Sequence, residues 1–569
     1  MQSIIIFIFS FFMIFQSAMA EEFMLNHPHW QETISVVNSK FQNKDGKKGS
    51  FFKLSPEVIL LDWEKEHAEV FVYNKSKNIW EFLEKDERFK INNEYNKKEY
   101  SFKKPYVKVD AFMRSPLSAL VKFQTSEPVR ITVKVVGKGT PDVVYSFDEY
   151  RKEHEVPLVG LFADYKNMVV ITATNRQGIK NSEKITVQTE DVFVDERWQR
   201  IKKSDKSFNY YALGNGQIYD EMGNLRYLFS TPGERRIYYH KNNIYTETSR
   251  EIKKYSLLGE TLGVYKYPTG FRGYTNAIAF KPNGNLLIFG DYAGKKALFG
   301  KKEHDTMRDY VLELDKKTGN VVAEYDLARL LNPDRPLVAN PFKTGYSRAD
   351  WAHLSGIDYD DKNSEIVVSG KHIGIVKIDE KTQKAIWWMT PHQLTHKSGR
   401  NGDKGDISHL LLTAVDGNKK VYPPVVQKGI KQGYGFKWPL KTQSVKYAGN
   451  GVYTVFDRSG KLEDMNLYTT TNSIASVFKV DDKAKTVRQL FFKDLLAYSD
   501  WGSMVMLHPV TNEIWVFLEN VPYKKGSIKK GSFIYRFGLK NVLLFSAFLQ
   551  KRQQNAAYFI QPYDFYNNE

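Results

Sequence analysis

The sequence predicts an all-β protein in which a small β-sandwich precedes a β-propeller. Aromatic residues make up 14% of the chain, with 37 Phe and 34 Tyr, and such side chains favour strands because they pack well on a pleated surface. From about residue 207 onward, strand–turn–strand units recur without helical periodicity, which favours a ring of roughly five to seven four-stranded blades. An array of β-sandwiches is the alternative, but a closed ring better removes exposed strand edges.

The first 20 residues have the features of a secretory signal. A nearly unbroken apolar run from Ile4 to Phe15 is followed by Ala18-Met19-Ala20, a small-x-small pattern typical of a signal peptidase site. We therefore expect residues 1–20 to direct export to the periplasm, with an uncleaved N-terminal anchor as the alternative. No later stretch reaches ~18 apolar residues, so the sequence predicts no further membrane span.

Composition and charge exclude several classes of function. The chain has no cysteine, which excludes disulfides, thiolate metal sites and a cysteine nucleophile. Its net charge of +18 arises from 83 Lys and Arg residues against 65 Asp and Glu residues. That excess either attracts anions, such as sulfated or phosphorylated small molecules, or reflects a lysine bias spread along the chain. Because no arginine- and aromatic-rich stripe is present, we expect no nucleic-acid partner.

The mature chain divides into three segments. Residues 21–105 form a Lys- and aromatic-rich lead-in with weak periodicity. Residues 106–190 are predicted to form the sandwich, because apolar residues at alternating positions between Val129 and Val135 are typical of a half-buried strand. Residues 191–569 are predicted to form the propeller, and the charged residues at its start are expected to be a link or a short helix.

Two layouts recur within the propeller segment. "YVLELDKKTGNVVAEYDL", "GIVKIDEKTQKAIWWMT" and "SVFKVDDKAKTVRQLFF" share a strand, an aspartate-led turn and a second strand ending in aromatics. "AIAFKPNGNLLIFG", "GIDYDDKNSEIVVSG" and "MVMLHPVTNEIWVFL" share the other layout. Gly and Asn accept the positive φ of tight hairpin turns, and Asp caps them. One unit of each layout gives four strands, the content of a blade, and a ligand is then expected at the mouth of the central channel.

One cluster of side chains suits chemistry best. Asp350-Trp351-Ala352-His353 precedes a predicted strand, and Lys371-His372 follows its hairpin partner. The hairpin should bring His353 close to Lys371 and His372, where two imidazoles and a cation could bind an anionic group and exchange a proton. A histidine stacked on tryptophan in a blade seam is the alternative, and the spacing alone favours neither.

Other motifs give weaker indications of a metal or cofactor site. His392 and His396 stand four positions apart, which on a helix would suit a metal pair, but the segment is typical of a loop and has no third ligand nearby. We therefore expect no metal site. No phosphate loop, GxSxG elbow or dinucleotide fingerprint occurs in a suitable context, so no cofactor is expected.

Several of these segments, taken together, resemble a known family. "SPLSALVKFQTSEPVRITVKV" and "EHEVPLVGLFADYKNMVVITAT" are similar to the N-terminal domain of the bacterial arylsulfate sulfotransferases, and "DWAHLSGIDYDDKNSEIVVSGKHIGIVKID" resembles a blade of their six-bladed propeller. The similarity is collinear from about residue 106 to about residue 520. It implies a periplasmic enzyme that moves a sulfuryl group from one phenol to another through a sulfohistidine, without a nucleotide donor.

The resemblance also assigns roles to single residues. His353 falls on the histidine of the family's DWxH motif, Lys371 on its sulfonate-binding arginine, and Ser444 on its nucleophilic histidine. Substrate-binding positions are expected at five further residues, Phe112, Asn276, Ser355, His372 and Gly502. Most of these positions depart from the family's pattern. A hydroxyl such as that of Ser444 needs an adjacent base, for which His353 and His372 are the candidates.

Two main functions follow from this comparison. The first is an active sulfuryl transferase with altered residues that uses His353 or His372 as nucleophile or base. The second is a pseudoenzyme, a non-catalytic propeller that binds an aromatic or sulfated small molecule or a protein partner. A different hydrolytic or lyase activity is a third alternative. The oligomeric state stays open, a homodimer included.

Overall fold

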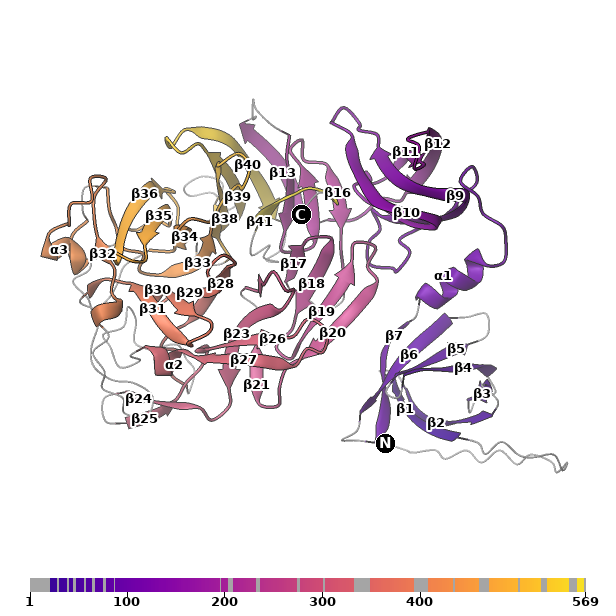
Figure 1. Cartoon of the computed structure of the whole chain (residues 1–569), viewed down its shortest axis with the longest axis horizontal. Coiled ribbons are helices and arrows are strands. Elements are labelled where there is room, and N and C mark those ends of the chain that lie inside the picture. Colours follow the sequence, from indigo (N-terminus) through magenta and orange to yellow (C-terminus); the bar gives the residue numbers. More distant parts are fainter. Residues whose placement is uncertain are drawn as a thin grey trace.

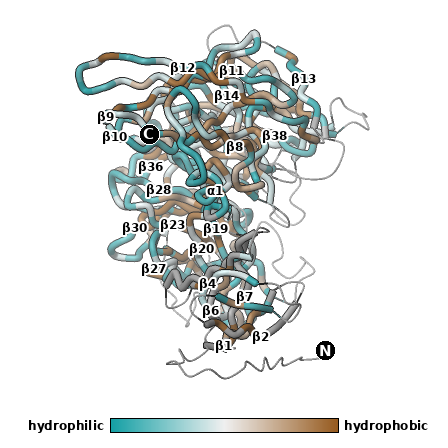
Figure 2. Tube along the Cα trace, turned by 90° about the vertical axis from the view of Figure 1, so that its right-hand side faces the viewer, coloured by the Kyte–Doolittle hydropathy of each residue, from teal (hydrophilic) through white to brown (hydrophobic). Residues whose placement is uncertain are grey.

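The computed structural model describes residues 21–566 of the 569-residue chain, except for 28–29, 38–39, 44–47, 56–57, 64–66, 75–77, 86, 195, 203–207, 232–235, 274–276, 300–301, 332–347, 393–407, 433–434, 460–469, 500–501, 523–529 and 552–559. Strands dominate the fold (Figure 1). Figure 2 shows hydrophobic segments, in brown, gathered in the interior and hydrophilic segments, in teal, in outlying loops. The expected signal segment lies outside the described residues.

Short strands at the N-terminal end form a closed barrel: β1 (Glu21–His27), β2 (Trp30–Val37), β3 (Lys40–Gln42), β4 (Lys48–Ser55), β5 (Val58–Trp63), β6 (His67–Asn74) and β7 (Ile79–Lys85). Neighbouring strands pair antiparallel, and β1 closes the barrel by pairing parallel with β7. Leu25, Ile59 and Leu61 are fully buried inside it. Buried residues alternate along β5, where Ile59, Leu61 and Trp63 face the interior, a period that the prediction of a lead-in did not recognise. Helix α1 (Glu87–Tyr95) follows the barrel.

The predicted sandwich segment forms one sheet of five strands: β8 (Tyr106–Val109), β9 (Ala119–Val135), β10 (Val143–Leu158), β11 (Tyr165–Thr174) and β12 (Lys180–Thr189). The strand order is β10-β9-β11-β12, and β8 pairs with β9. The apolar side chains of alternate residues from Val129 to Val135 are buried, as their period predicted. Register shifts between Phe147 and Glu153 interrupt the long β9–β10 pair.

The described residues beyond Glu196 contain six sheets of four or five strands, numbered 1 to 6 below. Sheet 1 contains β14 (Tyr210–Leu213), β15 (Gln217–Asp220), β16 (Leu225–Leu228) and β41 (Ile560–Tyr563). Sheet 2 contains β17 (Ile237–His240), β18 (Asn243–Glu247), β19 (Glu251–Ser256) and β20 (Thr261–Lys266). Sheet 3 contains β21 (Phe271–Gly273), β22 (Ala279–Phe280), β23 (Leu286–Tyr292), β26 (Tyr310–Leu314) and β27 (Val321–Asp326). A hairpin, β24 (Lys296–Phe299) and β25 (Lys302–Asp305), interrupts sheet 3, and helix α2 (Leu327–Leu330) ends it.

The remaining sheets follow the same plan. Sheet 4 contains β28 (Leu354–Asp360), β29 (Glu365–Gly370), β30 (Gly374–Asp379) and β31 (Lys384–Met389). Sheet 5 contains β32 (Thr413–Ala414), β33 (Thr442–Tyr447), β34 (Val452–Asp457), β35 (Ile474–Asp481) and β36 (Thr486–Asp494), with helix α3 (Pro424–Gln427) between its first two strands. Sheet 6 contains β13 (Glu196–Lys202), β37 (Met504–Leu507), β38 (Ile514–Pro522), β39 (Lys530–Phe537) and β40 (Leu543–Lys551). The all-β class, with an N-terminal sandwich and a propeller, is confirmed, while six blades in one closed ring stay a prediction.

Both ends of this region pair with distant strands. The C-terminal strand β41 pairs with β14 in sheet 1, and β13 pairs with β40 in sheet 6. The expectation of a link or short helix at 191–206 was therefore wrong, because residues 196–202 form a strand on a sheet edge supplied from the far end of the chain. Such exchange of terminal strands joins the beginning of a sheet array to its end.

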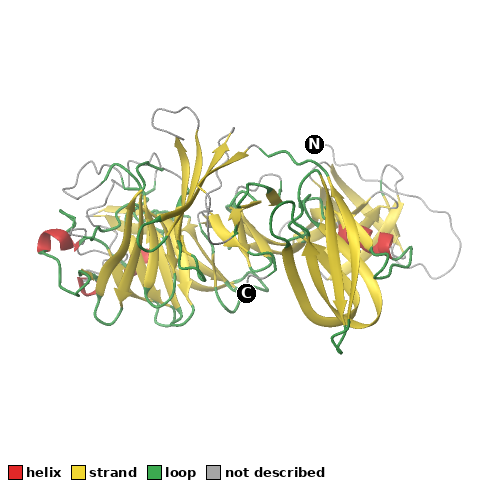
Figure 3. Ribbon diagram, turned by 90° about the horizontal axis from the view of Figure 1, so that it is seen from above, coloured by secondary structure: helices red, strands yellow, loops and turns green. Residues whose placement is uncertain are grey.

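The sandwich packs directly on sheets 1 and 2. Figure 1 shows β10 of the sandwich beside β16 of sheet 1, and Figure 3 shows from above that strands, in yellow, make up most of the molecule. One shared apolar cluster contains Val159 of the sandwich and Ala212 and Leu257 of the propeller. Arg226 of sheet 1 is fully buried, and its Nη2 donates to the carbonyl oxygen of Gly160 at 2.6 Å. The two domains therefore share a dry interface that includes a satisfied cation.

Buried cations connect neighbouring sheets of the propeller. Lys281 of sheet 3 lies 2.8 Å from Glu313 of its own sheet and 2.6 Å from Glu380 of sheet 4. Lys377 of sheet 4 likewise lies 2.8 Å from Asp482 of sheet 5. Each ammonium group is almost fully buried, so its charge is balanced only while both sheets keep their relative placement.

The seam between sheets 6 and 1 contains a guanidinium. Arg536 is fully buried; its Nε donates to Glu513 of sheet 6 at 2.8 Å, and its Nη1 to Glu221 of sheet 1 at 3.2 Å. The same Nη1 lies 3.2 Å from the phenol oxygen of Tyr211. Charge-assisted bonds of this kind are directional, so they hold the two sheets in one register.

Sheet 2 contains a buried carboxyl that is bonded to a phenol. Glu247 is 2% exposed, and the hydroxyl of Tyr267 donates to its Oε1 at 2.7 Å. Burial raises the pKa of Glu247 to about 7, against the smaller opposite effects of Tyr267 and Arg236. Removing the carboxylate from water disfavours its charged form, so Glu247 titrates near neutrality.

We predict that Arg536→Ala lowers the free energy of unfolding by about 3–5 kcal/mol, because it leaves two buried carboxylates without their cation. Urea denaturation measures the loss. Arg329→Ala is the matched control, since that side chain is 65% exposed, and should change the free energy by less than ~0.5 kcal/mol. If the two variants lowered the free energy of unfolding equally, Arg536 would not stabilise the seam, and the prediction would be wrong.

We predict that Glu247→Gln flattens the pH dependence of the melting temperature. Below pH about 4.5 the folded and unfolded states both hold the proton, whereas from there to pH about 7 only the folded state retains it. Wild-type stability therefore falls as pH rises through this window, and the glutamine removes that slope. Scanning calorimetry from pH 4 to 8 tests this, with the exposed Glu303→Gln as control. An unchanged slope in Glu247→Gln contradicts the assignment.

Candidate functional site

The candidate site lies where strand β28 begins. His353 directly precedes β28, and the β29–β30 turn carries Lys371 and His372. The backbone nitrogen of Lys371 donates to the carbonyl oxygen of His353 at 3.0 Å, and that of His372 donates to Ala352 at 3.3 Å. The two imidazole rings meet edge to face with their centroids 5.6 Å apart. The hairpin thus brings together the three residues that the sequence placed near one another.

A buried carboxylate orients His353. Asp350 is fully buried, and its Oδ2 lies 2.6 Å from Nδ1 of His353. Because a carboxylate can only accept, Nδ1 carries the proton in this bond. The neutral imidazole then has its lone pair on Nε2, the arrangement that a nucleophile or base requires.

Arg308 joins the site from sheet 3, and the sequence analysis missed it. Its Nη1 lies 3.2 Å from Nδ1 and 3.1 Å from Nε2 of His353, so the guanidinium rests against the ring face. The same nitrogen lies 3.4 Å from Oδ2 of Asp350. The sequence does place an arginine just before a predicted blade strand. The residues around it do not indicate which other blade its side chain contacts.

The surroundings keep His353 neutral. Burial is the largest influence and lowers the pKa of His353. Asp350 acts in the opposite direction, while the positive charges of Arg308 and Lys371 lower the pKa further. The net result is a pKa below the usual value of 6.5, so the imidazole stays uncharged into mildly acidic solution.

Two site residues adopt left-handed backbone conformations. The φ angle is 46° at His353 and 56° at Arg308, and neither is a glycine. Such conformations cost free energy in L-residues and persist only where the surrounding structure imposes them. Their coincidence at one contact indicates that the fold holds this pair in place.

Ser355 and Ser444 lie at the contact between sheets 4 and 5. The buried hydroxyl of Ser355 donates to the carbonyl oxygen of Thr442 at 2.7 Å, a bond that joins β28 to β33. A Cβ on Gly356 would lie 3.1 Å from Cα of Ser444, so glycine allows this close approach. The Ser444 hydroxyl is buried and has no hydrogen-bond partner among the described residues.

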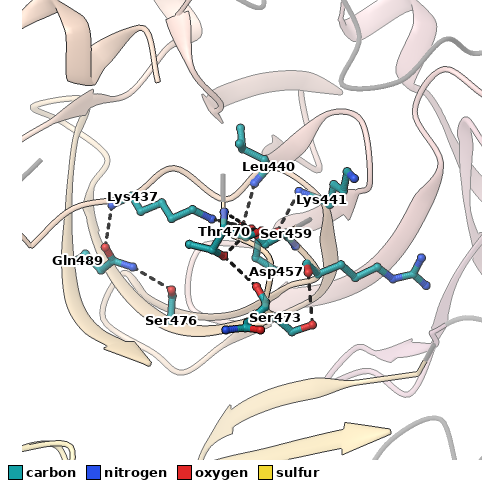
Figure 4. Close-up of polar contacts among 11 residues, drawn as sticks. Lys437, Leu440, Lys441, Asp457, Ser459, Thr470, Ser473, Ser476 and Gln489 are labelled. Carbon is teal, nitrogen blue, oxygen red and sulfur yellow. Dashed lines mark hydrogen bonds and ion pairs between the residues drawn. The ribbon is translucent and has the colours of Figure 1, made fainter. Parts of the chain in front are cut away.

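A buried carboxylate fixes the segment that leads to Ser444. Asp457 accepts hydrogen bonds from Nζ of Lys437 at 3.1 Å and from the backbone nitrogens of Leu440, Lys441 and Ser459 at 3.2, 3.1 and 2.7 Å (Figure 4). Burial would raise its pKa, but Lys437 and the backbone donors outweigh burial and lower it. Asp457 therefore stays ionised and anchors the start of β33.

The other expected residues are more dispersed. Gly502 is buried just before β37 at a φ of 50°, in the sheet that contacts sheet 5. Phe112 packs with Ile91 and Leu258 in a separate apolar cluster, so the structure does not bring it to His353. Asn276 lies outside the described residues.

The structure gives no support for the metal alternative. Nε2 of His392 lies 3.0 Å from the carbonyl oxygen of Leu412, a backbone contact typical of a structural histidine, and His396 lies outside the described residues. Among the residues that the structure describes, no three His, Cys, Asp or Glu side chains gather as metal ligands. Within the same residues, none of the helices has the length and apolar character needed to cross a membrane.

Comparison with known proteins identifies the family of the chain. Residues 106–190 match the family model described as the arylsulfotransferase Ig-like domain, and residues 180–542 match the model of the arylsulfotransferases (ASST). The chain is 22% identical to the arylsulfate sulfotransferase AssT of Escherichia coli O6:H1 over 488 residues, and 22% identical to that of Lelliottia amnigena over 484. Both alignments cover 67% of this chain and 79% of the relative.

Among solved structures, the β-propeller domain of Myceliophteria thermophila Cps50 (Swd1) aligns at a TM-score of 0.30 and 9% identity, covering 59% of this chain and 98% of that one. The family models between them span both the sandwich and most of the propeller, including His353, Lys371 and Ser444. From its family match and the domain order shared with it, the chain belongs to the arylsulfotransferase family.

Proposed function

We propose that this protein transfers a sulfuryl group between phenolic compounds and that His353 accepts the group. The observation that carries the proposal is the Asp350–His353 contact, in which a buried carboxylate holds a neutral imidazole with its lone pair on Nε2. Membership of the arylsulfotransferase family supports the reaction class. The aryl sulfate named in its relatives supports the substrate class.

The first half-reaction needs a strong neutral nucleophile. Nε2 of His353 attacks the sulfur of the aryl sulfate, the N–S bond forms, and the S–O bond to the aryl oxygen breaks. The electron pair of that bond leaves with the phenolate, which takes a proton from solvent. The proton on Nδ1 stays in its bond to Asp350, which stabilises the positive charge that develops on the ring.

The second half-reaction regenerates the imidazole. The oxygen of an acceptor phenol attacks the same sulfur and loses its proton to solvent, the new S–O bond forms, and the N–S bond returns its electron pair to Nε2. His372 is 1% exposed and packs edge to face against His353. We therefore propose that it positions the His353 ring and does not contact the substrate.

Ser444 is a weaker candidate for the nucleophile. A hydroxyl requires an adjacent base, and the described residues provide no hydrogen-bond partner for its Oγ. This observation also favours a second candidate function, the binding of aromatic or sulfated ligands without turnover.

In both cases we propose a periplasmic location after removal of residues 1–20, and we infer no cofactor.

We predict that purified protein converts 4-nitrophenyl sulfate in the presence of an acceptor phenol and that His353→Ala reduces kcat/KM at least ~100-fold. Release of 4-nitrophenol measures turnover. Because burial and two cations lower the pKa of His353, activity should persist as pH falls below 6.5 before imidazole protonation removes it. His392→Ala is the control and should retain activity.

The binding-only candidate gives a different result. In that case 4-nitrophenyl sulfate raises the melting temperature, the shift weakens with added salt, and no nitrophenol is released. Turnover that survives in His353→Ala contradicts the role of His353 as acceptor of the sulfuryl group.

A further inference from the structure

We propose that Arg308 binds the sulfonate group of the ligand and thereby selects esters of tetrahedral oxyanions. The inference rests on the proposed site at His353 and adds a residue from another sheet to it. Arg308 lies between the hairpin strand β25 and β26 of sheet 3, whereas His353 directly precedes β28 of sheet 4. The ligand's anionic end would therefore lie between the two sheets.

Backbone contacts place Arg308 beside the nucleophile. The backbone nitrogen of Met307 donates to the carbonyl oxygen of Ala349 at 3.1 Å, and that of Ala349 donates to Asp305 at 2.7 Å. Thr306 and Ala349 form a parallel bridge. These bonds fix the backbone just before Arg308 and just before Asp350, so the guanidinium is positioned before any ligand arrives.

The charges around His353 favour an anion. Two cations, Arg308 and Lys371, and one carboxylate, Asp350, act on the imidazole. The side chains of Arg308 and Asp350 are 14% and 0% exposed, so water screens their charges only partly. Because Asp350 is already bonded to His353, a bound anion would offset the remaining positive charge.

The type of cation indicates the type of anion. A guanidinium presents several N–H groups in one plane and bonds two oxygens of a sulfate or phosphate ester at once, whereas the ammonium of Lys371 is a point charge. Arg308 contacts both ring nitrogens of His353 through Nη1. A sulfonate held by this guanidinium would have its sulfur close to Nε2.

The left-handed backbone of Arg308 supports a functional role. Its φ of 56° is unusual for a long side chain, and residues held in this region cluster at binding and active sites. Arg308 also forms an ion pair with Asp350, which lies just before β28, and this contact satisfies part of the guanidinium.

The test compares Arg308→Lys with wild type by calorimetric titration of 4-nitrophenyl sulfate and of 4-nitrophenol. Loss of the two-point contact should weaken binding of the sulfate ester ~10- to 100-fold while leaving 4-nitrophenol unchanged. Arg329→Lys is the matched control, because this exposed arginine lies in helix α2 after sheet 3, and it should bind both ligands as wild type does. Equal affinity of Arg308→Lys and wild type for the sulfate ester overturns the proposal, as does a wild type that binds no sulfate ester.

A second measurement guards against misfolding. In Arg308→Gln, the pKa of His353 measured by NMR of labelled histidines should rise, because one neighbouring cation is gone. An unchanged pKa in a variant with the wild-type melting temperature overturns the contact on which the proposal depends.

The outcomes separate this inference from the proposed function. Sulfate-ester binding that requires Arg308, without turnover, supports the inference and contradicts sulfuryl transfer. Turnover that requires His353 but is indifferent to Arg308→Lys supports sulfuryl transfer and contradicts the inference.

Discussion

The arrangement of the propeller depends on buried cations that are shared between neighbouring sheets. Lys281, Lys377 and Arg536 each bond a carboxylate of the next sheet while their own side chains are almost fully buried. A charge removed from water is tolerated only when its partners stay within hydrogen-bond distance. Sliding one sheet past another would break these pairs, so the cations set the register of the sheets, and the apolar seams fill the space around them.

The candidate site is a consequence of that register. Arg308 comes from sheet 3 and His353 from sheet 4, and the Lys281–Glu380 pair spans the same two sheets. Ser355 joins sheet 4 to sheet 5 through a hydrogen bond to Thr442. Arg308, His353 and Ser355 are therefore each held by a contact that crosses a seam, which gives the site a rigidity that a single loop would lack.

The chemistry of the site follows from the balance of charges on one imidazole. Asp350 favours the imidazolium, while burial and two cations favour the neutral ring, and the neutral ring prevails. With one proton fixed on Nδ1, the lone pair is confined to Nε2. The position that the family pattern gives to its nucleophile is Ser444 here, and its hydroxyl lacks a base among the described residues. His353 is thus the side chain best prepared to accept a sulfuryl group.

The sequence by itself determined the recurring strands and turns of the propeller segment. It also determined the convergence of His353 with Lys371 and His372, because one hairpin connects them and hairpin geometry is local. It also determined the sandwich, through apolar residues at every second position. Only the tertiary structure decided that Arg308, 45 positions before His353, rests on its ring, that β13 pairs with β40, and that Phe112 packs elsewhere. Those contacts join residues far apart in the chain, and the burial and charge pairing that select them exist only once the sheets have assembled.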